Sequence, residues 1–323
     1  MKLFKQLIFS ALSLTPFLTI GQQKDTLSKK LDSLSVKTAE AGKQINNIEA
    51  DAYNYNTNLN LKSYFQLLGS DLKQEFTKPF HMKGKDWVRL GEFTALAIGV
   101  GSADEPIQRN AVEFATNHSG IRTLSSKITK FGGVYEVYTL AALGAYGFIF
   151  KSDKVKTTTL LATQAYITAG AMETVLKYLT GRTRPSAYGP TVESEPKFYG
   201  PFSKRARNIN GSKEFSSFPS GHTTVAFAAA TVFAKEYKNS VVVPILAYSA
   251  ATMIGLSRLT ENKHWASDVL VGAALGYLEG RQVVNNYHRY AKLKDPNQKK
   301  NSLSFNVQYQ FGQFMPGLVY SMK

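Results

Sequence analysis

The sequence predicts an all-α protein, a helical bundle of about six core helices followed by a short C-terminal β-hairpin. Between about Trp87 and Val284 the chain is a series of apolar, alanine-rich segments separated by polar or charged stretches. Most of these segments are longer than a typical strand, which favours helices. Strict alternation of apolar and polar residues, which is typical of a strand, begins at Leu303.

Residues 1–21 have the layout of a secretory signal peptide. Lys2 and Lys5 precede a short apolar stretch, and small residues stand just before Gln22, where cleavage is expected. The same stretch also fits an uncleaved membrane anchor. In either case we expect the chain to reach a membrane or to cross it.

Residues 22–86 are expected to form a polar helical extension and linker. From Lys24 to about Ala52, apolar residues recur with a four-three spacing, which predicts a short amphipathic helix. Residues 24–52 would either self-associate through this face or lie on their own domain. Residues 53–85 are mixed and polar, and we interpret them as a linker with helical pieces.

Residues 87–290 are expected to form the functional domain. Its helices are predicted, in order, at Leu90–Ser102, Val134–Phe150, Thr157–Val175, Thr223–Ala234, Val241–Leu256 and Val269–Leu278. Several are shorter than the ~20 apolar residues of a spanning helix, and the mean hydropathy of −0.20 is low for six spans. In a protein with six spans, the basic clusters between the helices would mark the cytoplasmic side. A cleaved signal peptide would instead place Gln22 outside, so the first span would enter from the wrong face. We therefore expect an exported bundle, peripheral to or partly embedded in an envelope membrane.

Residues 291–323 are expected to be a basic tail and a β-hairpin. Four lysines between Lys292 and Lys300 precede the alternating stretch from Leu303 to Phe311. Glycine and proline then indicate a turn, and Leu318–Met322 would be the partner strand.

The composition narrows the classes of function. The chain has 323 residues, enough to bury a sizeable core. A formal charge of +16 predicts anionic partners, such as a phosphorylated substrate or an anionic membrane surface. The basic residues carry no nucleic-acid-binding signature, so nucleic acid is not expected as a partner. The absence of cysteine excludes thiolate chemistry and Cys-ligated zinc.

The first cluster of candidate site residues ends the third predicted helix. Gly181 and Pro185 stop this helix, so that Lys177 and Arg184 can turn toward the same cavity. Two cations on one cavity would suit an anion. The alternative is a basic helix end that complements the helix dipole.

The second cluster opens the fourth predicted helix. Ser220 stands just before an apolar helical stretch, and the free N–H groups of a helix start form an anion site. Gly221 allows a ligand to approach the backbone, and His222 on the first turn would lie beside that ligand. The alternative is an ordinary capped helix.

The third cluster contains Arg258, His264 and Asp268. His264 and Asp268 are four residues apart, one helical turn, so the carboxylate could accept from Nδ1–H and leave Nε2 free as a nucleophile. Arg258 supplies a planar fork that matches phosphate oxygens. A purely structural His–Asp pair is the alternative.

Taken together, the clusters read Lys-x6-Arg-Pro, then Pro-Ser-Gly-His, then Ser-Arg-x5-His-x3-Asp. This signature resembles the type 2 phosphatidic acid phosphatase (PAP2) and vanadium haloperoxidase superfamily, on its phosphatase branch, and covers about residues 88–285. The resemblance implies an α-helical fold and an enzyme that uses no metal or other cofactor. It also implies that vanadate inhibits this enzyme.

The resemblance also implies a role for each site residue. The phosphoryl oxygens would be held by Lys177, Arg184 and Arg258, with Ser220 and the Gly221 amide completing the cradle. His264 would attack phosphorus, and Asp268 would hold and charge-stabilise it. His222 would protonate the leaving oxygen and later activate water.

We therefore expect a metal-independent phosphatase that hydrolyses a phosphomonoester or pyrophosphate through a phosphohistidine. The expected substrate is a lipid-linked phosphate of the cell envelope: phosphatidic acid, phosphatidylglycerophosphate, undecaprenyl pyrophosphate or lipid A phosphate. Three alternatives are a soluble periplasmic acid phosphatase of broad specificity, a vanadate-dependent haloperoxidase with vanadate as its cofactor, and a non-catalytic envelope scaffold.

Some neighbouring residues have plainer interpretations. Arg182 and Lys263 adjoin the signature and are interpreted as solvated charges; the alternative is that they add positive potential at the mouth of the site. The Asp104-Glu105 pair is interpreted as part of a helix end with no assigned role. The long loop from Ser186 to Ser217 is expected to roof the site.

Overall fold

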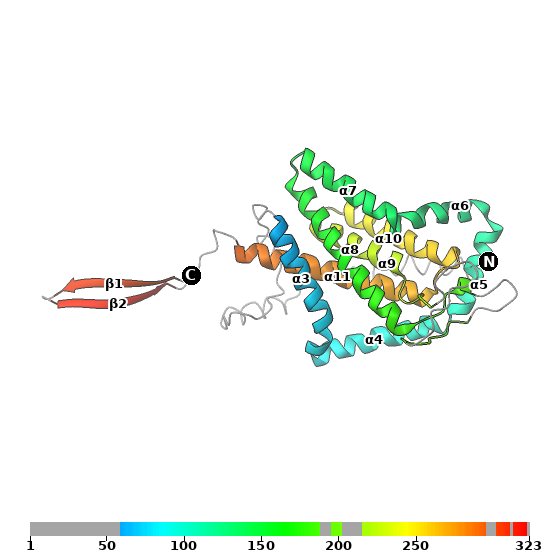
Figure 1. The fold of residues 1–323 in the computed structure, drawn as a ribbon, viewed down its shortest axis with the longest axis horizontal. Coiled ribbons are helices and arrows are strands. Elements are labelled where there is room, and N and C mark those ends of the chain that lie inside the picture. The colour runs from blue at the N-terminus through cyan, green and yellow to red at the C-terminus, as the bar shows by residue number, and fades with distance from the viewer. Residues whose placement is uncertain (1–58, 188–194, 202–214, 295–301, 311–312, 322–323) are drawn as a thin grey trace.

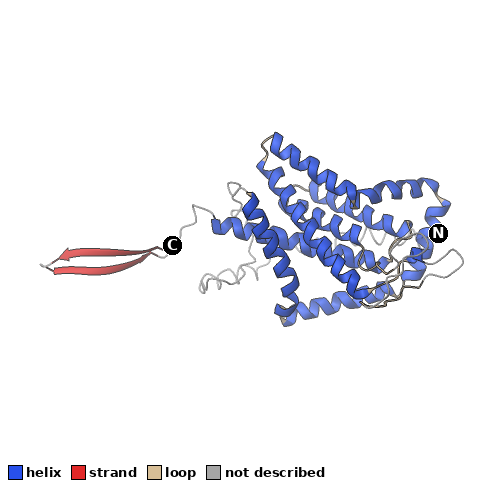
Figure 2. Cartoon of the chain, viewed as in Figure 1, coloured by secondary structure: helices blue, strands red, loops and turns tan. Residues whose placement is uncertain are grey.

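The structure is a computed structural model that describes residues 59–187, 195–201 and 215–294, together with the backbone of two strands at 302–310 and 313–321. The expected signal peptide, the amphipathic segment 24–52 and the side chains of the basic tail lie outside the described residues. From residue 59 to 294 the described chain consists of helices, their connections and one isolated β-bridge, which confirms the all-α class (Figure 2).

The described α-helices are α3 (Leu61–Thr77), α4 (Gly84–Gly101), α5 (Asp104–Asn117), α6 (Ser119–Ile128), α7 (Val134–Ile149), α8 (Asp153–Thr180), α9 (Gly221–Glu236), α10 (Val242–Thr260) and α11 (Ala266–Lys294). Three short 3-10 helices connect them, η3 (Lys78–His81), η4 (Thr129–Gly132) and η5 (Pro185–Ala187). The six predicted helices correspond to α4 and α7 to α11. α8 and α11 extend beyond their apolar stretches, because polar residues continue both helices.

The core of the bundle lies around α9, which packs against α8, α10 and α11 (Figure 1). Leu161, Ala228, Val232 and Val283 are completely or almost completely buried where these helices meet. Small residues allow the helices to approach closely, as small-residue interfaces do in other helix pairs.

Two glycines of α11 permit its contact with α9. A Cβ atom on Gly276 would lie 2.1 Å from the carbonyl oxygen of Thr224, and one on Gly280 would lie 2.4 Å from that of Ala228. The equal four-residue steps show that α9 and α11 run in parallel. Their first turns, which carry His222 and Asp268, therefore lie at the same end of the bundle.

Helix α3 packs on the bundle and is joined to it by hydrogen bonds. Gln164 donates to the carbonyl oxygen of Tyr64 over 2.7 Å, and Asn286 donates to the carboxylate of Asp71 over 2.5 Å. Residues that the sequence analysis placed in a linker thus contact the domain. The boundary at residue 86 stays a prediction.

The outward faces of α4, α7 and α10 carry many exposed apolar side chains. α4 and α7 lie on different sides of the bundle (Figure 1), and their exposed residues, with those of α10, include Trp87, Leu96, Ile98, Val137, Phe148, Ile149, Ile245 and Leu246. Among the described helices, α10 has the length and apolar composition of a membrane span, with a mean hydropathy of 1.4.

Two strands follow the helical part, β1 (Ser302–Gln310) and β2 (Gln313–Ser321). They pair antiparallel, with Ser302 opposite Ser321 and Gln310 opposite Gln313. Their side chains lie outside the described part of the chain, so what the strands pack on is not described. The hairpin as a stable element of the fold stays a prediction.

Candidate active site

The three sequence clusters meet at one end of the bundle. Gly181, with a φ of 54°, ends α8 in the left-handed conformation and returns its N–H to the carbonyl of Lys177. The backbone N–H of Ser220 donates to the carbonyl of Asp268 over 3.0 Å. The indole of Trp265 donates to the carbonyl of Thr183 over 2.8 Å. These bonds join the second cluster to the third and the third to the first.

His264 is held in one tautomer by a backbone carbonyl. Its side chain is 1% exposed, and Nδ1 lies 2.7 Å from the carbonyl oxygen of Ser217. Because a carbonyl can only accept, Nδ1 must carry the proton, and the lone pair of the neutral ring is on Nε2. The expected acceptor was Asp268, but its Oδ2 lies 3.5 Å from Nδ1. The hydrogen bond goes to Ser217, and Asp268 contributes a nearby charge.

Asp268 is completely buried and accepts from three donors. Arg182 donates to Oδ1 over 2.6 Å, while the Ser217 hydroxyl and the Trp265 backbone N–H donate to Oδ2 over 2.5 and 2.9 Å. Burial raises the pKa of the Asp268 carboxyl above its usual value, and the charge of Arg182 with these hydrogen bonds offsets only part of this increase. The carboxylate is thus fixed in place by groups that are not among the predicted site residues.

Two of the three predicted phosphate-binding cations have carboxylate partners. Lys177 lies 2.6 Å from Glu173, one turn earlier on α8, and Arg258 lies 2.6 Å from Glu261. Arg258 also donates to the hydroxyl of Thr129. A bound phosphate dianion would therefore compete with these two carboxylates for the cations.

Arg184, the third cation, is held by the backbone and side chain of Ser216. Its Nε donates to the Ser216 hydroxyl and its NH2 to the Ser216 carbonyl, both over 3.1 Å. These two bonds orient the guanidinium without neutralising its charge.

The cations act together on the two histidines of the site. Burial lowers the pKa of His264 well below its usual value, and the positive charges of Arg184, Lys177 and Arg258 lower it further. Burial and the same three charges lower the pKa of His222 to about 4. A cluster that disfavours further positive charge is suited to an anion.

Ser220 and Gly221 form the start of α9 beside these cations. Ser220 is fully buried, and its hydroxyl lies 2.9 Å from that of Thr223. A Cβ atom on Gly221 would lie 2.8 Å from the Glu173 carboxylate, so a glycine is needed for this close approach. The structure therefore brings the predicted cradle residues together around one helix N-terminus.

The turn before α7 covers His222. A Cβ atom on Gly133 would lie 3.2 Å from Nε2 of His222, and one on Gly132 would lie 3.2 Å from its Cβ. A side chain at either position would press against His222, so the two glycines permit this close contact. No role for either glycine was expected from the sequence.

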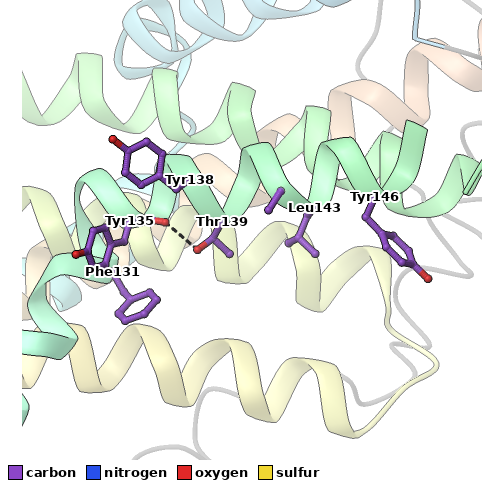
Figure 3. A pocket seen from close by; sticks show the side chains of 7 residues that line it. Phe131, Tyr135, Tyr138, Thr139, Leu143 and Tyr146 are labelled. Atoms are coloured by element: carbon purple, nitrogen blue, oxygen red, sulfur yellow. Dashed lines mark hydrogen bonds between the residues drawn. The ribbon is translucent and has the colours of Figure 1, made fainter. Parts of the chain in front are cut away.

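An open apolar groove starts at this turn. It has a volume of about 460 Å³ and runs along one face of η4 and α7, as Figure 3 shows. Its lining is aromatic and aliphatic, formed by Phe131, Tyr135, Tyr138, Thr139, Ala142, Leu143 and Tyr146.

Sequence reasoning missed residues that hold the site. The interpretation of Arg182 as a solvated charge is wrong, since its side chain is 3% exposed and paired with two carboxylates. Asp104 is fully buried, with no signal in its own sequence context. Ser217, which accepts from His264, is at the end of the loop expected to roof the site and had no role of its own. The described part of this loop includes Phe198, whose ring centroid lies 4.7 Å from the Arg182 guanidinium carbon. The rest of the proposed roof, residues 188–194 and 202–214, lies outside the described residues.

A metal site is not evident in the described part of the chain. Residues 59–187, 195–201 and 215–294 contain no group of three His, Asp or Glu side chains placed to hold an ion. Metal independence was expected from the family resemblance and stays a prediction.

Comparison with known proteins gives a family match over the region that contains the site. Residues 158–290, which contain all three clusters, match the sequence model of the PAP2 superfamily. A lipid A 1-phosphatase of Porphyromonas gingivalis is 35% identical over 156 residues, or 47% of this chain and 29% of that protein. A probable diacylglycerol pyrophosphate phosphatase 1 of Schizosaccharomyces pombe is 32% identical over 175 residues, or 46% of this chain and 61% of that protein.

A solved structure is also similar. A transmembrane PAP2 type phosphatidylglycerolphosphate phosphatase from Bacillus subtilis has 24% sequence identity and a TM-score of 0.45, covering 65% of this chain and 96% of that chain. The chain spans less than two thirds of the length of the two curated relatives above.

Proposed function

Because residues 158–290 match the sequence model of the PAP2 superfamily, we propose that the chain belongs to this family and is a metal-independent phosphatase of a lipid-linked phosphate, working through a phosphohistidine on His264. One observation carries the proposal. The Ser217 carbonyl fixes the proton of His264 on Nδ1, which leaves a nucleophilic lone pair on Nε2 among three cations.

In the first step, Nε2 of His264 attacks phosphorus, and a P–N bond forms as the P–O bond to the leaving group breaks. Lys177, Arg184 and Arg258 balance the charge on the phosphoryl oxygens, the task that metal ions perform in many phosphoryl-transfer enzymes. His222 donates its proton to the leaving oxygen.

In the second step, the neutral His222 takes a proton from water, whose oxygen attacks phosphorus while the P–N bond breaks. Phosphate is released and His264 regains its lone pair. The low pKa of His222, about 4 in the unliganded site, keeps the ring neutral, which is the form that can accept this proton. The first step needs the bound phosphate to raise that pKa, because its negative charge offsets the three cations.

The groove on α7 supports a lipid substrate. It begins at Phe131, next to the glycine turn that contacts His222, so an apolar chain in the groove would place its phosphate at the leaving-group side of the site. Its part on α7, the 13 residues from Val134 to Tyr146, corresponds to about 20 Å of helix. The two curated relatives are named for phosphorylated lipids, lipid A and diacylglycerol pyrophosphate.

The proposed location follows from the surface. The exposed apolar faces of α4, α7 and α10 suit a bundle partly embedded in an envelope membrane, and the formal charge of +16 favours anionic lipid. Export through residues 1–21 and self-association through residues 24–52 remain part of this proposal.

The test uses the purified full chain in detergent with EDTA present. Its substrates are p-nitrophenyl phosphate, phosphatidic acid, lipid A and undecaprenyl pyrophosphate. We expect hydrolysis with a preference for a lipid phosphate, and loss of more than about a thousandfold in kcat in His264→Ala. His81→Ala, which changes an exposed histidine of η3, is the matched control and should retain full activity.

Other outcomes would contradict parts of the proposal. Activity abolished by EDTA would overturn the metal-free mechanism. Equal turnover of soluble and lipid phosphates would favour a broad-specificity acid phosphatase. Halide oxidation that depends on added vanadate, without phosphate release, would indicate a haloperoxidase.

A further inference from the structure

Arg182 is a buried cation that none of the assigned roles uses. Its NH1 donates to Oδ1 of Asp268 over 2.6 Å and to the hydroxyl of Ser267 over 2.7 Å, and its NH2 donates to Asp104 over 2.6 Å. Its guanidinium lies over the rings of both Phe198 and Trp265, with its central carbon 4.7 and 5.8 Å from their centroids. The fork is therefore fixed in a dry, stacked position.

Asp104 holds this arrangement from a helix outside the superfamily match. It lies at the start of α5, whereas the match begins at residue 158. Its Oδ1 accepts from the backbone N–H of Ser267 over 2.9 Å, and its Oδ2 accepts from the Ser267 hydroxyl over 2.6 Å. Asp104 thus caps the first turn of α11 and fixes the far side of Arg182 at the same time.

Two connections lead from Arg182 to the proposed nucleophile. The first passes through Asp268, whose Oδ2 lies 3.5 Å from Nδ1 of His264. The second passes through Ser217, whose N–H donates to the carbonyl of Arg182 over 3.0 Å while its own carbonyl accepts from His264. A change of the Arg182 side chain would therefore act on His264 through Asp268, while the backbone connection through Ser217 stays in place.

The charges around this group show what Arg182 contributes. Asp268 faces Arg182 directly, and the positive charges of Lys177 on α8 and Arg184 after it also act on Asp268. His264 faces these two cations and Arg258 on α10. Without Arg182, two fully buried carboxylates, Asp104 and Asp268, would lose the cation that bridges them. A buried carboxylate without its partner takes up a proton instead.

From this geometry we propose that Arg182, anchored by Asp104, is a positioning residue that keeps Asp268 ionised and oriented beside His264. This inference rests on the proposed function. When Nε2 carries the phosphoryl group and Nδ1 keeps its proton, the ring is cationic. The negative charge of Asp268 then stabilises the intermediate, and a protonated Asp268 would not.

The first test measures kcat and KM on p-nitrophenyl phosphate between pH 5 and 8 for the full chain. Arg182→Met should lower kcat by about a hundredfold with KM changed less than about threefold, since the interaction acts on the intermediate. The acid limb of the kcat profile should move to higher pH by about one unit, because Asp268 takes its proton more readily. Arg182→Lys should recover part of the loss, and Asp104→Asn should lower kcat by about tenfold.

Matched controls separate this role from general effects of substitution. Arg89→Lys on α4 and Glu113→Gln on α5 change exposed residues of the same types and should leave kcat, KM and the pH profile unchanged. Thermal melting of each variant gives its folded fraction. If the losses in kcat follow that fraction and the pH profile stays in place, Arg182 is only structural and the proposal is overturned.

A second measurement does not depend on turnover. The Nδ1–H proton of His264, identified by its disappearance in His264→Ala, should shift in the NMR spectrum of Arg182→Met, Arg182→Lys and Asp104→Asn, and not in the controls. An unchanged resonance in all three variants overturns the proposal. If the wild-type chain releases no phosphate but the resonance still shifts, the proposed function fails while the positioning role stands.

Discussion

At the scale of the residue, the proposed chemistry depends on how neighbouring charges set the two histidines. His222 and His264 both lie among cations that disfavour their protonated forms. For His264 this keeps the nucleophile neutral. For His222 it means that the proton needed by the leaving group must arrive together with the negative charge of the substrate.

This coupling predicts a pH dependence of oxyanion binding. The pKa of His222 is about 4 in the unliganded site, and bound orthovanadate should raise it, so binding takes up a proton at pH values above about 4. Inhibition by vanadate should therefore strengthen as the pH falls through the raised pKa of the complex.

The measurement is the inhibition constant of vanadate between pH 5 and 8, compared with His222→Gln. The variant cannot take up this proton, so its inhibition should vary less with pH. An equally steep dependence in His222→Gln would assign the proton to another group.

At the scale of the element, the site exists because α9 and α11 start side by side. Gly276 and Gly280 allow backbone contact between the two helices, and the first turn of each then contributes to the same cradle. A side chain larger than hydrogen at either position meets backbone atoms, which cannot move aside as a flexible side chain can.

Gly276→Ala should therefore destabilise the protein. Its Cβ would lie 2.1 Å from the Thr224 carbonyl oxygen, and overpacking of this kind costs about 1–3 kcal/mol of unfolding free energy. Thermal or denaturant unfolding measures the effect. Gly170→Ala on α8 is the control, because nothing lies within 4 Å of its Cβ position, and it should be neutral or stabilising by up to about 1 kcal/mol. Equal stability of the two variants would contradict the required close contact.

At the scale of the whole molecule, a polar buried site sits in a bundle with an apolar exterior. The outward faces of α4, α7 and α10 expose many large apolar side chains. So many would be unusual on a surface that faces only water. The groove on α7 (Figure 3) lies on this exterior, and its first lining residue, Phe131, is next to the turn that contacts His222. A substrate with its apolar chain in lipid and its phosphate in the site would match both the apolar exterior and the groove.

The two tryptophans report on this orientation. Trp87 on α4 is 55% exposed, whereas Trp265 is fully buried, and the chain has no other tryptophan. In anionic vesicles whose acyl chains carry bromine as a quencher, wild-type fluorescence should fall, and that of Trp87→Phe should fall much less. Equal emission of the wild type with and without brominated lipid would show that this face of α4 stays outside the bilayer.

The sequence alone determined the helical class and selected the residues proposed for the site. Apolar stretches longer than a strand predicted α4 and α7 to α11. Basic and histidine side chains near the predicted helix ends indicated Lys177, His222 and His264. These signals are local, since both the burial of a helix face and the chemistry of a helix end depend on residues a few positions apart.

The tertiary structure decided which groups hold the proposed nucleophile. Asp104 and Arg182 are 78 residues apart in sequence, and Ser217 precedes His264 by 47, so no spacing rule could pair them. His264 was expected to bond to Asp268, which its sequence spacing favours, but the packing of the chain before α9 places the Ser217 carbonyl closer. A contact between distant segments depends on how whole helices pack. That packing is determined by many core residues together and not by the neighbours in sequence of the two residues in contact.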